Sequence, residues 1–427
     1  MYVGQPRCWL FFFVLFGWST LVNAQNERLD LTDVCLLALR QHPSIVIRQD
    51  GILAAESDLA AAQWQRFPSL GVDLNTAVAQ NTEAGQKTDR LGATLRVQQP
   101  IWSGGRIDAE IDAARVRHGL AEVDKRQAEQ DLLSRVVEVY IEHQRWQARL
   151  RVAEENLLEH RRLLALIERR TDQKVSSRAD LALAQARLQQ ALAEQQGFRL
   201  GEQKTLHNLS QLLGVRVQGE DLRPAPLNQI AWPDLPTALQ AAEVHSPHLQ
   251  RLQAEVALAQ VDVATRRAVL YPQLSLRYEK FTGSAQTLAN DRLMLALEYQ
   301  PGAGLGSLSS AKAAARRVSM ASGGVELGLR ELSDRVGEAF NEWQIFATQR
   351  STAEDYAAAT RDVMASYLRQ FTVGRKTWQE VLNAQREVAQ SAYAAIDTIQ
   401  GEILASYRLA ILTGQLSPAS LIEQKQK

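Results

Sequence analysis

Four short segments of the chain alternate between apolar and polar residues. They cover residues 70–78, 91–101, 274–281 and 292–300. Because successive side chains of a β-strand point to opposite faces, the alternation predicts strands with one apolar and one polar face. Each segment has about nine residues, the length that a tilted strand needs to cross a bilayer. Polar stretches at 81–90 and 282–291 predict the loops of two hairpins.

The polar face of the predicted strands carries side chains that suit contact with water. They are Asp73, Asn75, Thr94, Arg96, Arg277, Glu279 and Glu298. Apolar residues such as Val72, Leu95 and Leu276 form the opposite face. Soluble antiparallel sheets show the same alternation. A small soluble sheet at the end of a helical rod therefore remains an alternative to a membrane barrel.

Two windows without proline predict long helices. They run from Ile101 to Arg223 and from Gly302 to Ser417, and they are rich in strong helix formers. Each window has room for two helices, which we expect in the first window at about 108–170 and 178–213. A helix of about 60 residues is roughly 90 Å long and needs a long partner to bury its apolar stripe. Coiled-coil spacing is present at Leu181, Ala184, Leu188 and Ala191.

The chain contains the same succession of segments twice. Pro43 and Pro68 flank a predicted short helix at 44–66, and both prolines recur 204 positions later around a second short helix at 248–270. Four of the twelve prolines lie in 223–236, which predicts a non-helical linker. Each repeat then has a short helix, a β-hairpin and two long coiled-coil helices. We expect a first repeat at 25–222, the linker at 223–236, a second repeat at 237–416 and a C-terminal tail at 417–427.

The first 24 residues resemble a secretory signal peptide. A short basic start with Arg7 precedes an apolar run at 10–16, and small residues end the segment at Ala24. An N-terminal anchor helix is the alternative, although the run is shorter than the roughly 20 residues of a membrane-spanning helix. Removal of residues 1–24 leaves Cys35 as the one thiol, which we expect to be a small buried hydrophobe. Cys8 precedes the apolar run, so the sequence does not predict lipidation.

Composition and motifs give no indication of an enzyme. The 48 basic and 48 acidic side chains balance, whereas a nucleic-acid binder usually has a basic excess. The sequence has no phosphate-binding loop, no serine–histidine–acid set and no metal-ligand spacing beyond the isolated pair His245 and His248. We therefore expect no cofactor, no metal, no catalytic residue and no nucleic-acid partner.

Four amphipathic strands cannot form a membrane barrel within one chain. Unpaired strand edges are too costly in hydrocarbon, and membrane barrels start at eight strands. Two copies would supply eight strands, which their own side chains fill, whereas three copies would supply twelve and leave a channel. A homotrimer is therefore the expected closed form, with the long helices of all copies in a ring.

Several motifs resemble those of the TolC family of outer-membrane efflux and type I secretion channels. They are Phe-Pro-Ser-Leu at 67–70, Gln-Pro-Ile-Trp-Ser-Gly-Gly-Arg at 99–106, Phe-Thr-Val-Gly-Arg-Lys-Thr at 371–377 and Val-Leu-Asn-Ala-Gln at 381–385. The second run covers a strand-to-helix turn at Pro100, Gly104 and Gly105, and Pro301 takes the equivalent place in the second repeat. The resemblance extends over nearly all of the chain after residue 24.

The resemblance implies a mainly α-helical protein with a membrane β-barrel portion. Three copies would form a 12-stranded barrel in the outer membrane of a Gram-negative bacterium, continuous with a periplasmic α-helical barrel. Such a duct conducts substrates passively. It works with a periplasmic membrane-fusion adaptor and an inner-membrane transporter that is either an ABC transporter or proton-driven.

The resemblance also assigns roles to two helix-turn-helix tips at 172–180 and 372–380. By this resemblance, the pore constriction is lined by Asp180, Glu380 and Asn383. Capping of a helix by the two carboxylates, Asp180 and Glu380, is the simpler alternative. The latch and adaptor-docking positions are Lys174, Phe371, Gly374, Arg375, Lys376 and Trp378. Lys174 replaces the glycine that corresponds to Gly374, so we expect the first tip to turn differently.

The function expected from these features is that of an exit duct in a three-part export system. The tip motif favours type I secretion of adhesin-like proteins, with efflux of small molecules as the alternative. A periplasmic coiled-coil structural or adaptor protein is the alternative from a different class.

Overall fold

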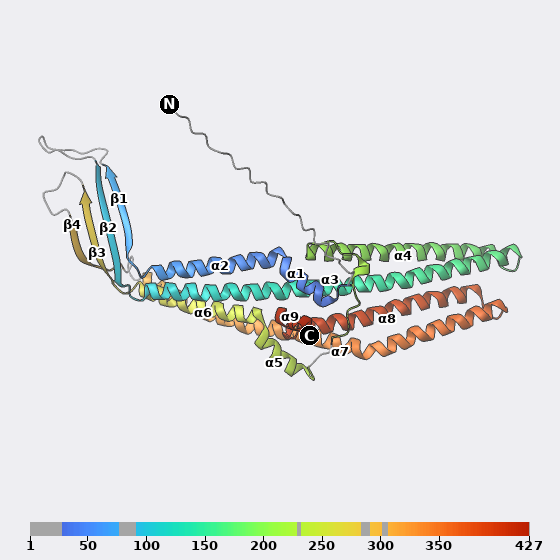
Figure 1. The fold of residues 1–427 in the computed structure, drawn as a ribbon. Helices are drawn as coiled ribbons and strands as arrows, with labels where there is room; N and C mark the ends of the chain where they lie inside the picture. The colour runs from blue at the N-terminus through green and yellow to red at the C-terminus, as the bar shows by residue number, and fades with distance from the viewer. Residues whose placement is uncertain (1–27, 77–90, 229–231, 283–290, 301–305, 427) are drawn as a thin grey trace, which may run out of the picture.

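The protein is elongated, with a small sheet at one end and long helices over the rest of its length (Figure 1). The computed structural model describes residues 28–76, 91–228, 232–282, 291–300 and 306–426. The predicted signal peptide, Pro301 and most of both predicted hairpin loops lie outside these residues. No helix in the described part of the chain is long and apolar enough to cross a membrane.

Each repeat supplies two short helices, two strands and two long helices. The first repeat contains α1 (Leu31–Gln41), α2 (Pro43–Trp64), β1 (Ser69–Thr76), β2 (Leu91–Trp102), α3 (Arg106–Asp172) and α4 (Arg178–Leu213). The second contains α5 (Leu235–His245), α6 (Pro247–Ala268), β3 (Gln273–Thr282), β4 (Asp291–Glu298), α7 (Gly306–Thr372) and α8 (Trp378–Leu412). A 3-10 turn, η1 (Gly219–Asp221), follows α4, and α9 (Pro418–Gln426) ends the described chain.

The predicted elements all form, with ends that differ by a few residues. Three helices were missed, namely α1, α5 and α9. The prediction of a fully non-helical linker is wrong at its end, because α5 begins at Leu235 with Pro236 in its first turn. Proline is tolerated there, since the first backbone N–H groups of a helix have no partner within it. The tail is also helical, and Leu421 of α9 is 1% exposed in the core around α1.

The long helices α3 and α7 each have 67 residues, which corresponds to roughly 100 Å. Towards the sheet, α3 lies between α2 and α6; towards the other end it lies between α4 and α8 (Figure 1). The helix α7 packs against α6 and α8. In the half of the molecule that ends at the tips, the helices contact one another in the order α4, α3, α8 and α7. Helices α4 and α7 are therefore the outer members of this row.

Two glycines allow each long helix to pack closely on its partner. A Cβ atom at Gly201 would lie 2.7 Å from the Trp146 ring, and one at Gly401 would lie 2.8 Å from the Phe346 ring. Gly401 lies 200 positions after Gly201, and Phe346 lies 200 positions after Trp146. The two repeats thus use the same contact, in which an aromatic ring of α3 or α7 lies against bare backbone of α4 or α8.

The largest core lies where the ends of several helices meet near the middle of the molecule. Tyr140 is fully buried there, and its hydroxyl donates to the Arg223 carbonyl oxygen at 2.5 Å. Cys35 lies in the same core with no exposed surface, which confirms its expected role as a small hydrophobe. Burial raises the pKa of the Cys35 thiol to about 12.

Candidate functional site

The four strands form one antiparallel sheet in the order β1-β2-β3-β4. The pairing of β2 with β3 joins the two repeats, and β1 and β4 are the edges. Asp73 lies opposite Thr94, Arg96 lies opposite Glu279, and Glu279 lies opposite Arg292. Since directly opposed residues share a face, this register places all seven residues predicted to face water on one side of the sheet.

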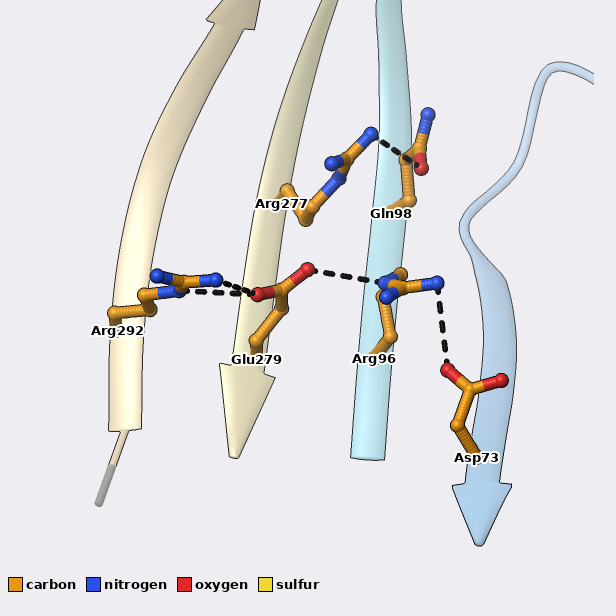
Figure 2. A network of polar contacts seen from close by, with 6 residues as sticks. All are labelled: Asp73, Arg96, Gln98, Arg277, Glu279 and Arg292. Carbon is orange, nitrogen blue, oxygen red and sulfur yellow. Dashed lines mark hydrogen bonds and ion pairs between the residues drawn. The ribbon is translucent and has the colours of Figure 1, made fainter. Parts of the chain in front are cut away.

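Charged side chains on that face form a row across all four strands (Figure 2). Arg96 lies 3.4 Å from Asp73 and donates to Glu279 Oε1 at 3.0 Å. Arg292 donates twice to Glu279 Oε2, at 3.0 and 2.6 Å. Only 3% of Glu279 is exposed, because the two arginines enclose its carboxylate. The row alternates in sign, and its outermost members, Asp73 and Arg292, belong to the two edge strands.

Two further members of this face, Arg292 and Gln98, were not among the residues predicted to face water. Arg292 follows the same alternation as Glu298 but stands at the start of its strand, beside a loop. Gln98 accepts a hydrogen bond from Arg277 at 3.3 Å (Figure 2). The alternation alone could have found both residues. The partner of Gln98 lies on a strand 179 positions away, whereas Arg292 pairs with Glu279 across its own hairpin, 13 positions away.

The opposite face of the sheet is apolar and is not covered by the rest of the described chain. Leu70, Leu74, Leu293 and Leu297 are each between 67% and 72% exposed. Leucine side chains in this number rarely face water together on a soluble monomer. The sheet thus separates an uncovered apolar surface from a row of charges.

The strand-to-helix turn after β2 depends on two glycines. Gly104 has φ +64° and Gly105, the residue before α3, has φ +87°, in the left-handed region that favours glycine. Ser103 is buried, and its hydroxyl oxygen accepts from the Ile107 N–H at 3.2 Å, which caps the start of α3. Pro100 lies in β2 just before this turn.

At the other end of the molecule the two tips turn in the same way. Lys174 has φ +60° and Gly374 has φ +78°. The next residue in each tip donates a backbone hydrogen bond to the helix before it, Val175 to Arg170 at 2.8 Å and Arg375 to Gln370 at 2.9 Å. The expectation that Lys174 changes the turn is therefore wrong. The lysine adopts the glycine conformation, at a cost of about 1–2 kcal/mol, because the hydrogen bonds fix the turn.

Both predicted gate carboxylates cap the helices on which they lie. Asp180 accepts from the Ser177 N–H at 3.2 Å and from its hydroxyl at 2.8 Å. Glu380 accepts from the Thr377 N–H at 2.8 Å and from Lys376 Nζ at 2.7 Å. The hydrogen bond from Lys376, together with those from Thr377, lowers the pKa of Glu380 to about 2. Asn383 is exposed one turn further along α8.

Two aromatic residues of the second tip connect it to the first. Phe371 and Trp378 are 5% and 4% exposed, with ring centroids 5.3 Å apart. The Arg170 guanidinium of α3 lies 4.7 Å from the centre of the Phe371 ring, and the Trp378 indole N–H donates to the Asp180 carbonyl oxygen at 3.2 Å. Within one chain, therefore, the end of α7 contacts α3 and the start of α8 contacts α4.

The remaining tip residues divide into engaged and exposed side chains. Besides bonding Glu380, Lys376 Nζ lies 4.2 Å from the centre of the Tyr367 ring, so its contacts are within its own hairpin. Lys174 and Arg375 are exposed at the turns. Across the described residues, no group of three or more His, Cys, Asp and Glu side chains is arranged to hold a metal ion.

A sequence model of the outer membrane efflux protein family matches residues 36–215. Over this segment the chain is similar to the outer membrane efflux protein family. The resemblance predicted from the motifs is confirmed, and the matched stretch runs from α1 to the end of α4. Proteins of this family are passive channels rather than enzymes. No curated protein matches the chain by sequence.

Solved structures of membrane proteins share the fold of most of the chain. A membrane protein from Pseudomonas aeruginosa is 20% identical with a TM-score of 0.79, over 90% of this chain and 93% of that one. The outer membrane protein VceC from Vibrio cholerae is 16% identical with a TM-score of 0.77, over 90% and 96%. The CmeC outer membrane channel of Campylobacter jejuni is 14% identical with a TM-score of 0.79, over 94% and 89%. These matches confirm the predicted fold class.

Proposed function

We propose that this protein is the outer-membrane exit duct of a three-part export system in a Gram-negative bacterium. The observation that carries the proposal is the sheet, which has a row of charges on one face and uncovered leucines on the other. Lipid suits the leucine face and an aqueous lumen suits the charged face. The lumen residues are those predicted from the sequence, with Arg292 and Gln98 added.

Closure of the barrel requires further copies of the chain. Strands β1 and β4 are edges, and unpaired backbone groups are too costly in hydrocarbon. Because each copy supplies four strands of an antiparallel meander, β4 of one copy can pair antiparallel with β1 of the next. Three copies give the 12-stranded barrel of a homotrimer. The outer helices α4 and α7 then meet those of neighbouring copies and close a helical tube.

The tube would extend into the periplasm and end at the tips. Helices of roughly 100 Å are much longer than the approximately 30 Å hydrocarbon core of a bilayer. We place the periplasmic adaptor at the exposed tip side chains, such as Lys174 and Arg375, and the inner-membrane transporter beyond it. Three copies each of Asp180, Glu380 and Asn383 would line the constriction, where the carboxylates favour cations.

Two classes of exported substrate are each supported by a different observation. The tip motif at 374–385 supports type I secretion of an adhesin-like protein, which we propose first. The efflux description of the matched family supports export of small molecules. Deletion of the gene separates the two. Loss of one large protein from the medium, at unchanged sensitivity to toxic compounds, would support secretion, and the opposite result would support efflux.

Fractionation tests the duct itself. We expect the mature chain, without residues 1–24 and without attached lipid, in the outer membrane as a trimer that changes gel mobility on heating. Recovery as a soluble periplasmic monomer would contradict the proposal and favour a coiled-coil structural or adaptor protein.

A further inference from the structure

The charged row on the sheet ends in side chains of opposite sign. Asp73 on edge strand β1 is acidic, and Arg292 on edge strand β4 is basic. Their side chains are 48% and 57% exposed, whereas the Glu279 side chain between the two arginines is buried. The row is therefore fully paired in its middle and open at both ends.

Each end of the row has a polar atom that is not used in the sheet. Arg292 donates to Glu279 through Nε and Nη2, and no hydrogen bond or ion pair with another described residue uses its Nη1. Asp73 contacts Arg96 through Oδ2, and its Oδ1 makes no such contact in the described part of the chain. Figure 2 shows that this nitrogen points away from Glu279 and that this oxygen points away from Arg96.

The two ends of the row cannot meet within one chain. Strands β2 and β3 lie between β1 and β4, so Asp73 and Arg292 are at opposite edges of the sheet. In the proposed barrel, however, β4 of one copy lies beside β1 of the next. That neighbour brings a carboxylate to the open side of Arg292, on the same face of the sheet.

Alternation restricts how the two edges can pair. Asp73 and Arg292 are on the charged face, whereas Val72 and Leu293 beside them are on the apolar face. A slip by one residue would bring charges against leucines, so the permitted registers differ by two residues. An ion pair forms where Asp73 is directly or diagonally opposite Arg292, since diagonal neighbours are about 7–8 Å apart. Inside the chain Arg96 already reaches Asp73 in this way, although the two are not directly opposed.

We infer that Arg292 of one copy binds Asp73 of the next and that this ion pair sets the register between copies. The inference rests on the proposed barrel of three copies. The row then continues around the lumen as a closed ring in which acidic and basic side chains alternate. The partner that this edge selects is a second copy of the chain, because its β1 presents the opposite charge on the matching face.

Chemical crosslinking of the mature full-length chain tests the register while all the charges are present. In a Cys35→Ala background, Val72→Cys is combined with Leu293→Cys, and the matched control combines Leu74→Cys with Leu297→Cys. A bismaleimide that spans about 8 Å joins direct or diagonal neighbours. Both pairs have one cysteine on each edge strand, so crosslinks form only between copies. We expect covalent trimers from the first pair and several-fold fewer from the control, which is at least four residues out of register.

Charge variants then test the ion pair itself. In the Val72→Cys/Leu293→Cys chain, Asp73→Asn should lower the yield of covalent trimer several-fold, because alternation alone also permits other registers. Asp73→Glu keeps the charge and should retain the yield. Glu298→Gln removes a carboxylate of β4 that has no ion pair with the described residues, and it should leave the yield unchanged.

Several results would overturn the ion pair but not the duct. One is crosslinking of the control pair in place of the first pair, and another is an equal yield from Asp73→Asn and Glu298→Gln. A chain that is trimeric but gives no crosslink with either pair would also exclude this register. Absence of crosslinks together with recovery of a monomer would instead show that the barrel does not form.

Discussion

At the scale of single residues, a lysine and a glycine share one left-handed backbone conformation. Lys174 and Gly374 take the same left-handed position in the two tips. That conformation costs a residue with a Cβ atom about 1–2 kcal/mol, whereas it costs glycine almost nothing. The first tip thus carries strain that the second does not.

Replacement of Gly374 should therefore lower stability. We expect Gly374→Ala to destabilise the tip by about 1 kcal/mol and Lys174→Gly to recover part of that amount in the first tip. The midpoint of thermal unfolding in detergent measures both. Gly337→Ala is the matched control, because Gly337 lies in α7 with ordinary φ and nothing within 4 Å of a new Cβ atom. Equal losses of stability at positions 374 and 337 would contradict the expected backbone strain at position 374.

The carboxylate of Glu380 makes the second tip sensitive to strong acid only. Hydrogen bonds from Lys376 and Thr377 hold the pKa of Glu380 at about 2, below the ordinary value of 4.5. Because the folded state lowers this pKa, the contribution of the carboxylate to the tip is complete above about pH 4.5 and is lost as the pH falls towards 2. Glu380 therefore keeps its negative charge in all but strongly acidic solution.

Conductance of the reconstituted channel should follow that carboxylate. We expect cation selectivity to stay constant from about pH 7 to pH 4 and to fall below about pH 3, and Glu380→Gln should remove this pH dependence. Lys376→Met should move the fall to higher pH, because Lys376 is the main cause of the low pKa. A pH profile that Glu380→Gln leaves unchanged would exclude this residue from the constriction.

Glu279 offers a second test in the proposed lumen. Glu279→Gln removes the carboxylate that holds Arg96 and Arg292, so two arginines lose their shared partner. We expect anion permeability relative to cation permeability to rise severalfold in planar bilayers. Glu298→Gln changes the charge by the same amount without freeing an arginine and should have a smaller effect. Equal effects would mean that only net charge matters.

At the scale of elements, helix pairing depends on bare backbone at Gly201 and Gly401. A methyl group at either position meets an aromatic ring at less than 3 Å, so the helices must separate. We expect Gly201→Ala to cost about 1–3 kcal/mol, seen as a lower midpoint of thermal unfolding. Gly197→Ala, one turn earlier in α4 with free space around it, should be neutral or stabilising. A similar loss at both positions would point to helix flexibility instead.

Local signals explain which elements could be predicted. The long helices and the strands follow from proline placement and alternation, which are properties of the sequence over short distances. The short helices α1 and α5 end at prolines that begin the next helix, so no proline-free window reveals them. The irregular pairing of β2 with β3 between Pro100 and Trp102 and the contact of Trp378 with Asp180 depend on how segments about 170 to 200 positions apart meet. No local pattern encodes such meetings.

At the scale of the whole molecule, the tips of one chain are connected to each other. Trp378→Phe keeps the ring against Phe371 but removes the hydrogen bond to the Asp180 carbonyl oxygen. We expect the open probability of the proposed duct to change by a few-fold in single-channel recordings, because this bond ties the second tip to the first. Trp343→Phe, in the core beside Phe340, is the control with the same change of side chain. Unchanged gating in Trp378→Phe would mean that the tips move together without this bond.

The unbroken length of α3 has a mechanical consequence. The helix runs from the glycine turn beside the sheet to the first tip, and its sequence contains no proline. Such a rod acts as a lever: a tilt of about 2° at the sheet end displaces the far end by roughly 3–4 Å over roughly 100 Å. In the proposed duct, small adjustments of the sheet would thereby be amplified into movements as large as an atom at the tips.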